Sequence, residues 1–404
     1  MFVTFEISSL VRLSELFFHR MPSARNMEGG LIRTSLFDSH VSAGAKMVDF
    51  HGYELPIWYS SIQEEHMQTR RSAGLFDVSH MGLFRFRGEG VRSWLSEVST
   101  QNYMKFQPGR CGYCHFLDYD GKIIDDMIFA ISSESEVFGV PNSTMISVML
   151  NWLSALLPED NSISIEDMSE KTSIIALQGP QSSNVIGEVL GSENAIGRFT
   201  CQEIMDNELG ISGWIQGTGY TGEEGVEIFL TNDKSSALWE ALSSNSSVTP
   251  VGLGARDTLR MEKGYLLSGQ DFLWPGLEKE IDGLPEGFLS RSTIETAVPY
   301  GLEISHDFIG KSALIESGRS GTRLWGAKCM ERGPSPRTGH PVFNGPGEDA
   351  EIVGFVTSGG PSPSLEMSGI ALCYLDNCEE GGEVWIQSSS RRRVRSLLKK
   401  GPFL

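Results

Sequence analysis

The amino-acid sequence predicts an α+β fold built from several domains. The chain has 404 residues, which at roughly 150 residues per domain corresponds to about two to three domains. Short strand-like runs alternate with helical runs, but without the regular strand–helix rhythm of a parallel sheet. Hydrophobic residues make up 40% of the chain and charged residues 21%, a composition typical of a folded protein.

The sequence predicts a hairpin near residue 120, followed by two helices. Residues 115–117 and 123–129 are strand-like, and the Asp-Gly pair within 118–122 is typical of a hairpin turn. Residues 144–157 and 235–242 have the apolar pattern of helices.

The charge balance excludes two classes of partner. The chain has 33 Lys and Arg against 52 Asp and Glu, a formal charge of −19. We therefore expect neither nucleic acid nor an anionic membrane surface as a partner, because both require a broad basic surface. No stretch reaches the roughly 18 uninterrupted apolar residues of a membrane span. We expect a cytoplasmic protein with its six cysteines reduced.

Residues 1–30 differ in composition from the rest of the chain, since they combine several phenylalanines with three arginines. An amphipathic, Arg-bearing leader would suggest a mitochondrial transit peptide and a location in the matrix. Three glutamates and the acidic body count against that interpretation. We favour a simple N-terminal extension, with Met21 or Met27 as a candidate initiator.

Two short motifs match known patterns without the context that those patterns need. Residues 111–115 fit the haem-attachment pattern Cys-x-x-Cys-His, but they run into a strand, so we expect packed thiols. Residues 217–222 fit Gly-x-Gly-x-x-Gly, which binds dinucleotides only when a helix follows. Residues 226–230 are strand-like instead. We therefore expect a Gly-rich turn between two strands.

Glu227 is a charged residue within that predicted strand. It shares a face with Phe229, whereas Val226, Ile228 and Leu230 share the other. A carboxylate on a half-buried face costs free energy unless it is paired. It either pairs with a nearby cation or accepts two hydrogen bonds from the edge of a flat heterocycle.

Asp125 and Asp126 lie among apolar residues of the predicted hairpin. Neighbouring strand residues point to opposite faces, so we expect no carboxylate pair. Burial would raise the pKa of each carboxyl, which suits a group that transfers protons. Alternatively, one aspartate caps the Asp-Gly turn and the other is solvated.

Basic residues form two further clusters. Arg256 and Arg260 lie one turn apart on a helix that begins near Gly254. They could hold an anionic ligand or pair with acidic residues across a domain boundary.

Residues 333–347 are rich in proline and glycine and should form a loop. The basic cluster in 391–400 is either a solvated strand edge or a docking site for an acidic partner.

Taken in order, these motifs resemble the glycine cleavage T-protein family, the aminomethyltransferases of the glycine cleavage system. The resemblance begins near Ser35 and covers about nine-tenths of the chain. The matching stretches are Ala45-Lys-Met-Val-Asp-Phe50, Gly52-Tyr-Glu-Leu-Pro56, Gly74-Leu-Phe-Asp-Val-Ser-His-Met81, Asp120-Gly-Lys-Ile-Ile-Asp-Asp126, Leu177-Gln-Gly-Pro180, Gly219-Tyr-Thr-Gly-Glu-Glu-Gly-Val-Glu227, Ala255-Arg-Asp-Thr-Leu-Arg260, Asp307-Phe-Ile-Gly-Lys311, Val356-Thr-Ser-Gly-Gly-Pro-Ser-Pro363 and Pro402-Phe403.

The resemblance implies a three-domain cloverleaf of mixed and antiparallel sheets with helices and a C-terminal β-barrel-like domain. The first two domains are implied to be discontinuous in sequence. The expected parts are an extension at 1–34, a first folate-binding domain at 35–80 and 164–271, a second domain at 81–163 and 272–308, and the barrel-like domain at 309–404.

The implied reaction moves the methylene carbon of an aminomethyl group from a lipoylated carrier (H) protein to tetrahydrofolate, with release of ammonia. Tetrahydrofolate is the co-substrate, no metal is implied, and we expect a monomer. The main alternative is a related folate-dependent demethylase of a small amine or sulfonium. An iron–sulfur maintenance protein is less favoured, because Lys263-Gly-Tyr265 lacks that branch's cysteine.

The family's site residues can be carried over to matching positions. Asp126 would be the catalytic residue that steers proton transfer, and Glu227 would bind the pterin edge. The folate pocket would be completed by Tyr113, Tyr220, Asn142, Met81 and Arg256. About twenty extra residues from Phe272 onward, and Glu303-Ile304 after Gly301-Leu302, depart from the family pattern.

Overall fold

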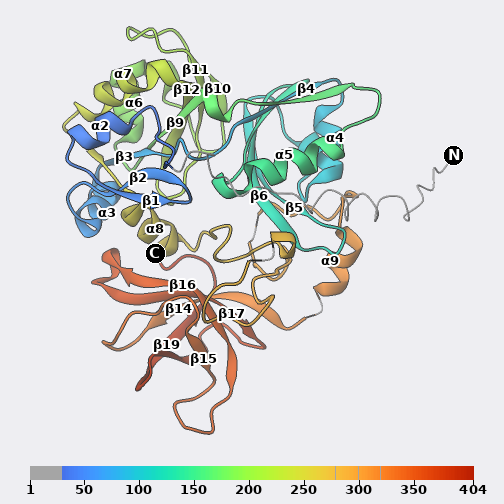
Figure 1. Cartoon of the computed structure of the whole chain (residues 1–404), viewed down its shortest axis with the longest axis vertical. Helices are drawn as coiled ribbons and strands as arrows, with labels where there is room; N and C mark the ends of the chain where they lie inside the picture. The colour runs from blue at the N-terminus through green and yellow to red at the C-terminus, as the bar shows by residue number, and fades with distance from the viewer. Residues whose placement is uncertain (1–29, 278, 299, 319) are drawn as a thin grey trace, which may run out of the picture.

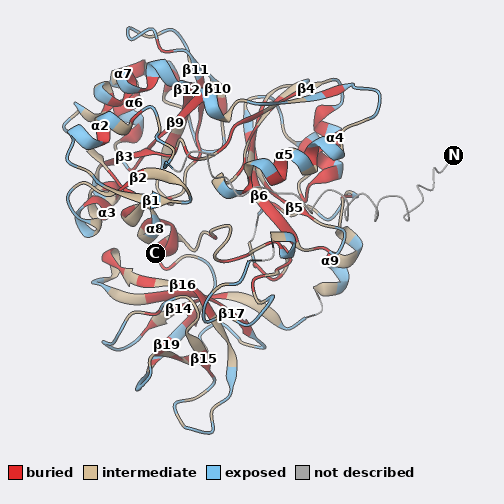
Figure 2. Cartoon of the chain, in the orientation of Figure 1, coloured by how far each residue is buried: buried red, intermediate tan, exposed pale blue. Residues whose placement is uncertain are grey.

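The computed structural model describes residues 30–277, 279–298, 300–318 and 320–404. Three lobes meet around a common centre (Figure 1). Buried residues concentrate in the strands and on the inner sides of the helices (Figure 2). The candidate transit peptide lies almost entirely outside the described residues.

The first lobe is a six-stranded sheet with helices on both faces. Only β13 runs parallel to its neighbour β3; the other pairs are antiparallel. In sheet order the strands are β10 (Cys201–Glu203), β11 (Gly213–Gln216), β12 (Gly225–Thr231), β9 (Thr172–Gln178), β3 (Ala73–Asp77) and β13 (Val248–Pro250). The other elements of this lobe are α2 (Phe37–Ser42), β1 (Lys46–Phe50), β2 (Tyr53–Trp58), α3 (Ile62–Arg71), α6 (Ser182–Leu190), α7 (Asn232–Ser243) and α8 (Leu253–Lys263).

Alternation along β12 decides which side of this sheet meets which neighbour. Val226, Ile228 and Leu230 pack with residues of α6 and α7. Phe229 points the other way, into a cluster shared with α8 and with the second lobe. The predicted division of faces in this strand is confirmed, and it places Glu227 on the side of the second lobe.

The second lobe is a five-stranded antiparallel sheet covered by two helices, α4 (Val91–Val98) and α5 (Ile146–Ala155). Phenylalanines such as Phe86 and Phe129 fill the space between the sheet and α4. The strands, in sheet order, are β5 (Arg110–Leu117), β6 (Ile123–Ser133), β7 (Glu136–Val140), β4 (Phe84–Gly88) and β8 (Ile163–Asp167).

The third lobe is a closed barrel whose interior is filled by side chains such as Trp325, Val342 and Ile386. The short helix α9 (Lys311–Ser317) precedes it and packs Leu314 against the β5–β6 hairpin. Around the barrel the strands are β14 (Thr322–Cys329), β17 (Ser368–Asp376), β16 (Ile352–Ser362), β15 (Pro341–Phe343), β18 (Glu383–Ser389) and β19 (Arg392–Lys399).

Most of the predicted elements are present. The hairpin is β5–β6, and the two predicted helices are α5 and α7. One expectation is wrong: the predicted loop at 333–347 contains β15, which proline at its first position does not prevent. The chain returns to the first sheet with β9 at Thr172, later than the expected residue 164, because β8 still pairs with β4.

A buried ion pair joins the first lobe to the barrel. Nη1 of Arg260, on α8, donates to Oδ2 of Asp271 at 2.7 Å, and both side chains are fully buried. Nη2 of Arg260 donates to the Ser358 hydroxyl of β16 at 2.9 Å. Ser358 and Thr357 both donate to Oδ1 of Asp271, at 2.7 and 2.5 Å. Both charged groups are shielded from solvent, and hydrogen bonds from or to protein groups take the place of hydration.

None of the helices in the described ranges is long and apolar enough to cross a bilayer.

Asp271→Ala should destabilise the protein strongly, because it leaves the buried Arg260 guanidinium with only the half-exposed Asp257 as a counter-ion. We expect a loss of about 3–5 kcal/mol in the free energy of unfolding. Equilibrium urea unfolding would measure it. Glu166→Ala, which breaks the more exposed pair with Arg85, is the matched control and should cost no more than about 1 kcal/mol. Equal losses for the two variants would contradict this account.

Candidate active site

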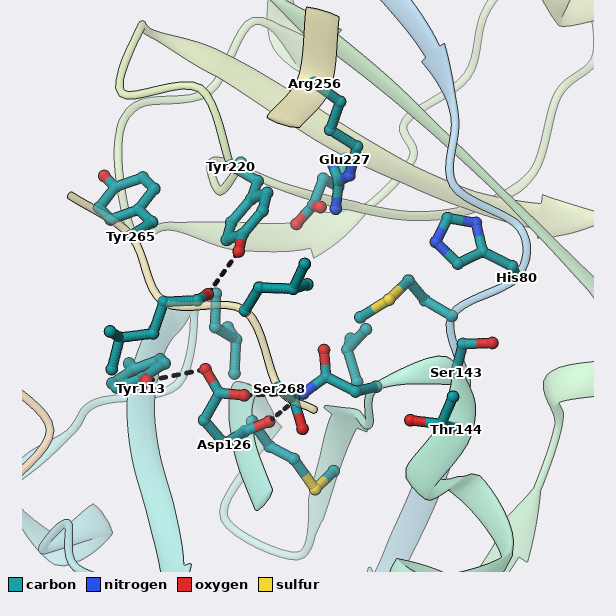
Figure 3. A pocket seen from close by; sticks show the side chains of 18 of the residues that line it. His80, Tyr113, Asp126, Ser143, Thr144, Tyr220, Glu227, Arg256, Tyr265 and Ser268 are labelled. Carbon is teal, nitrogen blue, oxygen red and sulfur yellow. Dashed lines mark hydrogen bonds between the residues drawn. The ribbon is translucent and has the colours of Figure 1, made fainter. Parts of the chain in front are cut away.

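A cavity lies where the first lobe, the second lobe and the loop after α8 meet. Its walls come from the β5–β6 hairpin, from β12 and the turn before it, from α8, and from residues 264–268. Figure 3 shows Tyr113 and Asp126 on one side of this space and Glu227 and Arg256 across it. All the predicted site residues line this cavity: Met81, Tyr113, Asp126, Asn142, Tyr220, Glu227 and Arg256.

Asp126 is held on β6 by two donors. The Tyr113 hydroxyl donates to its Oδ2 at 2.8 Å, and Nδ2 of Asn142 donates to its Oδ1 at 2.7 Å. Tyr113 reaches it from the paired strand β5, and Asn142 from the end of β7. The carboxyl therefore faces the cavity in a fixed orientation.

Asp125 and Asp126 both accept from one amide, so they lie closer together than the opposite faces of a regular strand would place them. Nδ2 of Asn142 donates to Oδ1 of each, at 2.8 and 2.7 Å. A bulge in the pairing of β5 with β6 lies beside them, and a bulge increases the local twist of a strand. Neither aspartate caps the hairpin turn: Asp118 does, by accepting from the backbone N–H of Lys122 at 2.8 Å.

Burial raises the pKa of both aspartates, as predicted. For Asp125, the charge of Asp126 raises it further, while hydrogen bonds from Asn142 and from the Ser268 hydroxyl, 2.9 Å away, act in the opposite direction. For Asp126, hydrogen bonds from Tyr113 and Asn142 oppose the effect of burial. Such a pair retains a proton at higher pH than a solvated carboxyl does.

Glu227 lies across the cavity, in the middle of β12. The Thr218 hydroxyl and, at 3.4 Å, Nε2 of Gln216 both donate to its Oε2. Within the described part of the chain, Oε1 accepts no hydrogen bond. The carboxylate is thus oriented from one side and can accept from a ligand on the other.

Two aromatic rings and a guanidinium stack beside Glu227. The guanidinium of Arg256 lies 4.7 Å from the ring centroid of Tyr220. Tyr220 in turn stacks on Tyr265, with centroids 5.8 Å apart, and donates its hydroxyl hydrogen bond to the carbonyl of Leu266. Of the two arginines with open alternatives, Arg256 faces the cavity and Arg260 forms the pair between lobes.

The Gly-rich turn before β12 is explained by packing, not by a phosphate. A Cβ at Gly219 would lie 1.8 Å from Oε1 of Gln178, and one at Gly217 would lie 1.9 Å from the carbonyl oxygen of Gly197. The buried Gln178 amide donates to the carbonyl of Thr218 at 3.0 Å. The expectation of a turn between two strands, β11 and β12, is confirmed.

Several lining residues were not predicted. Tyr265 and Ser268 belong to the loop that follows α8, which ends at Gly264 with a left-handed φ of +75°. His80 is buried, and among the described residues its Nδ1 has no hydrogen-bond partner. Tyr300 comes from the segment that departs from the family pattern. The family pattern has an aromatic residue just after Gly301-Leu302, and this chain has none there. A search of the neighbouring positions for a replacement would have found Tyr300.

The other sequence motifs lie outside the cavity's chemistry. Cys111 and Cys114 are buried strand thiols whose pKa values are raised, by a contact with Cys201 and by burial respectively, so the expectation of packed thiols is confirmed. The basic cluster in 391–400 belongs to β19, which pairs on both sides in the closed barrel, so the strand-edge interpretation is wrong. Among the described residues, no group of three or more His, Cys, Asp or Glu could hold a metal ion.

Comparison with known proteins agrees with this geometry. The family described as "GCVT N-terminal domain" matches residues 36–273, and "Glycine cleavage T-protein C-terminal barrel domain" matches residues 323–403. The chain belongs to the glycine cleavage T-protein family. The α+β architecture with a closed C-terminal barrel, expected from the sequence, is confirmed.

Individual T-protein relatives match over nearly their whole length. The aminomethyltransferase of Geobacillus kaustophilus (strain HTA426) is 36% identical over 375 residues, covering 91% of this chain and 97% of that one. That of Thermosipho melanesiensis is 32% identical, covering 92% and 96%. A crystal structure of glycine cleavage system aminomethyltransferase T from Bartonella henselae has a TM-score of 0.81 at 27% identity and covers 93% and 98%.

The raised pKa of Asp125 predicts a pH-dependent stability difference in this T-protein family member. The folded form holds a proton that the unfolded chain releases at lower pH, so its stabilising effect is present at low pH and is lost as pH rises through the folded pKa. Asp125→Asn, which mimics the protonated form, should therefore gain on the wild type as pH rises from about 4 to the folded pKa of about 8, by at most about 1.4 kcal/mol per pH unit, and should gain no more above that pH.

Unfolding measured across that pH range, with Asp120→Asn in the exposed hairpin turn as the matched control, would check this. A difference between Asp125→Asn and wild type that stays constant with pH would contradict it.

Proposed function

We propose that this protein is a tetrahydrofolate-dependent aminomethyltransferase. It takes the methylene carbon from an aminomethyl group on the lipoyl arm of a carrier protein and releases ammonia. The observation that carries the proposal is one cavity with an oriented carboxylate on each side, Glu227 and Asp126, and aromatic rings between them. The relatives named above are aminomethyltransferases, which does not favour the demethylase alternative.

Glu227 would bind the pterin ring. The pterin edge presents adjacent N–H donors, which match the two oxygens of a carboxylate. Thr218 and Gln216 fix the carboxylate from behind, so little side-chain entropy is lost when the ligand binds. The stacked Tyr220 and Tyr265, with the Arg256 guanidinium, supply flat surfaces beside it.

Asp126 would manage the protons of the transfer. The carbon forms bonds to N5 and N10 of the folate and breaks its bonds to the amino nitrogen and the lipoyl sulfur. The two protons released from N5 and N10 end on ammonia and on the thiol, so the reaction balances. A carboxyl whose pKa is raised by burial is a stronger proton acceptor than a solvated one, which suits it to accept and return such protons.

A glycine-cleavage assay reconstituted with a lipoylated carrier protein and tetrahydrofolate tests the proposal. The wild type should release ammonia, whereas Asp126→Asn should lose turnover by orders of magnitude and keep its Kd for tetrahydrofolate, because the amide preserves the shape of the site. No ammonia release by a folded, folate-binding wild type would refute the proposed function. Unchanged turnover of Asp126→Asn would remove this residue from the mechanism.

Glu227→Ala should weaken tetrahydrofolate binding, because the pterin loses charged acceptors. Loss of a hydrogen bond to a charged group costs about 1.5–3 kcal/mol, or roughly ten- to hundredfold in Kd. Isothermal titration calorimetry would measure it. Glu223→Ala, on the Gly-rich turn but paired with Arg70, is the matched control. Wild-type affinity in Glu227→Ala would contradict the assignment to the pterin.

A further inference from the structure

A chain of hydrogen bonds runs from Asp126 into the protein interior. The Tyr113 hydroxyl donates to Asp126 at 2.8 Å and lies 3.0 Å from Nε2 of His115. Nδ1 of His115 lies 3.0 Å from the hydroxyl of Thr293. His115 and Thr293 are 0% and 1% exposed, so water does not compete for these contacts.

The number of protons in this chain fixes its direction. Burial keeps His115 neutral by lowering its pKa to about 3, so the ring carries one N–H. When Asp126 is ionised and Tyr113 donates to it, the oxygen of Tyr113 can only accept from His115. The ring proton must then sit on Nε2, and Nδ1 must accept from Thr293. Every donor in the chain is satisfied in this arrangement alone.

We propose that His115 is a positioning residue that, through Tyr113, holds Asp126 in its ionised form, with Thr293 fixing the required tautomer. A hydroxyl that accepts a hydrogen bond becomes a better donor, so His115 strengthens the contact of Tyr113 with the carboxylate. A proton taken up at Oδ2 of Asp126 would compete with the Tyr113 hydroxyl for the same contact, and the Nε2–H tautomer of His115 leaves Tyr113 no other acceptor in the chain. The proposal rests on the proposed function, because it concerns the proton-transfer group of that reaction.

Thr293 belongs to the segment from Phe272 to about Ile294 that is extra relative to the family pattern. Two contacts fix this segment in place. Nε1 of Trp274 donates to Oδ2 of Asp118 in the hairpin turn at 3.0 Å. The guanidinium of Arg291 lies 4.3 Å from the ring centroid of Tyr374 in the barrel. The extra segment therefore places the Thr293 hydroxyl at the inner end of the hydrogen-bond chain that leads to Asp126.

Glu227 and Arg256 lie across the cavity from Asp126, and the groups that surround it more closely are phenols, one thiol and one carboxyl. Burial raises the pKa values of three phenols and one thiol around Asp126, so these groups stay neutral at pH 7. They are Tyr113, Tyr220, Tyr300 and Cys114. One carboxyl can ionise near that pH. That carboxyl is Asp125, which shares Asn142 with Asp126. A titration of Asp126 must therefore also be carried out with Asp125 replaced by asparagine.

The test is a carbon-13 NMR titration of aspartate-labelled protein, with the Asp126 signal assigned by its loss in Asp126→Asn. His115→Phe and Thr293→Val, which remove the donors but keep similar volumes, should move the titration midpoint of Asp126 to higher pH by about half to one pH unit. The acid limb of kcat should move in the same direction. Thr293→Ser and His115→Gln should keep the wild-type midpoint, because a Gln amide can donate to Tyr113 and accept from Thr293.

Each outcome has a defined consequence. A midpoint that moves in Phe and Val variants but not in Gln and Ser variants supports the proposal, and an unmoved midpoint in His115→Phe and Thr293→Val overturns it. If His115→Phe does not fold, the comparison of Thr293→Val with Thr293→Ser decides. The NMR midpoint of Asp126 does not depend on turnover. A wild type that releases no ammonia would therefore refute the proposed function, and the NMR test of His115 could still be interpreted.

Discussion

The arrangement of the lobes depends on one buried ion pair, Arg260 with Asp271. Both charges are removed from water, which is tolerable only because each is paired and fully hydrogen-bonded. The partners come from α8, from the loop that follows it, and from β16 of the barrel. Together with the buried Glu262, which accepts from Ser362 and from the backbone N–H of Ser364 in the barrel, this ion pair fixes the orientation of α8, so that Arg256 faces the cavity. It also fixes the loop that carries Tyr265 and Ser268.

The same physical logic recurs inside the cavity. Carboxylates there are costly to bury, and each is oriented by neutral donors; the charge of Glu227 also interacts with the nearby Arg256 guanidinium. Asn142 serves Asp125 and Asp126, while Thr218 serves Glu227. Neutral donors leave the carboxylates reactive or free to bind, whereas a direct ion pair would hold their pKa values low. The site therefore has groups that can exchange protons with a substrate and an acceptor that can recognise one.

Local patterns predicted much of this molecule, and non-local geometry decided the rest. The hairpin and the faces of β12 followed from alternation and turn chemistry, and the seven lining residues followed from the resemblance to the T-protein family. The convergence of Asp125 and Asp126 did not, because strand alternation takes no account of a bulge. Tyr265, Ser268 and Tyr300 reach the cavity on irregular loops held by distant contacts. The basic residues of β19 do not lie on a sheet edge, because the barrel closes and β19 has a neighbour on each side. The sequence of one strand cannot show that closure.

The central claim is that one cavity holds the folate between Glu227 and Asp126. A crystal structure of the protein with bound tetrahydrofolate tests it most directly. We expect the N–H edge of the pterin on the Glu227 carboxylate and N5 within hydrogen-bond or single-water reach of Asp126. A folate bound elsewhere, or bound here with its pterin turned away from Glu227 and its N5 distant from Asp126, would contradict the account.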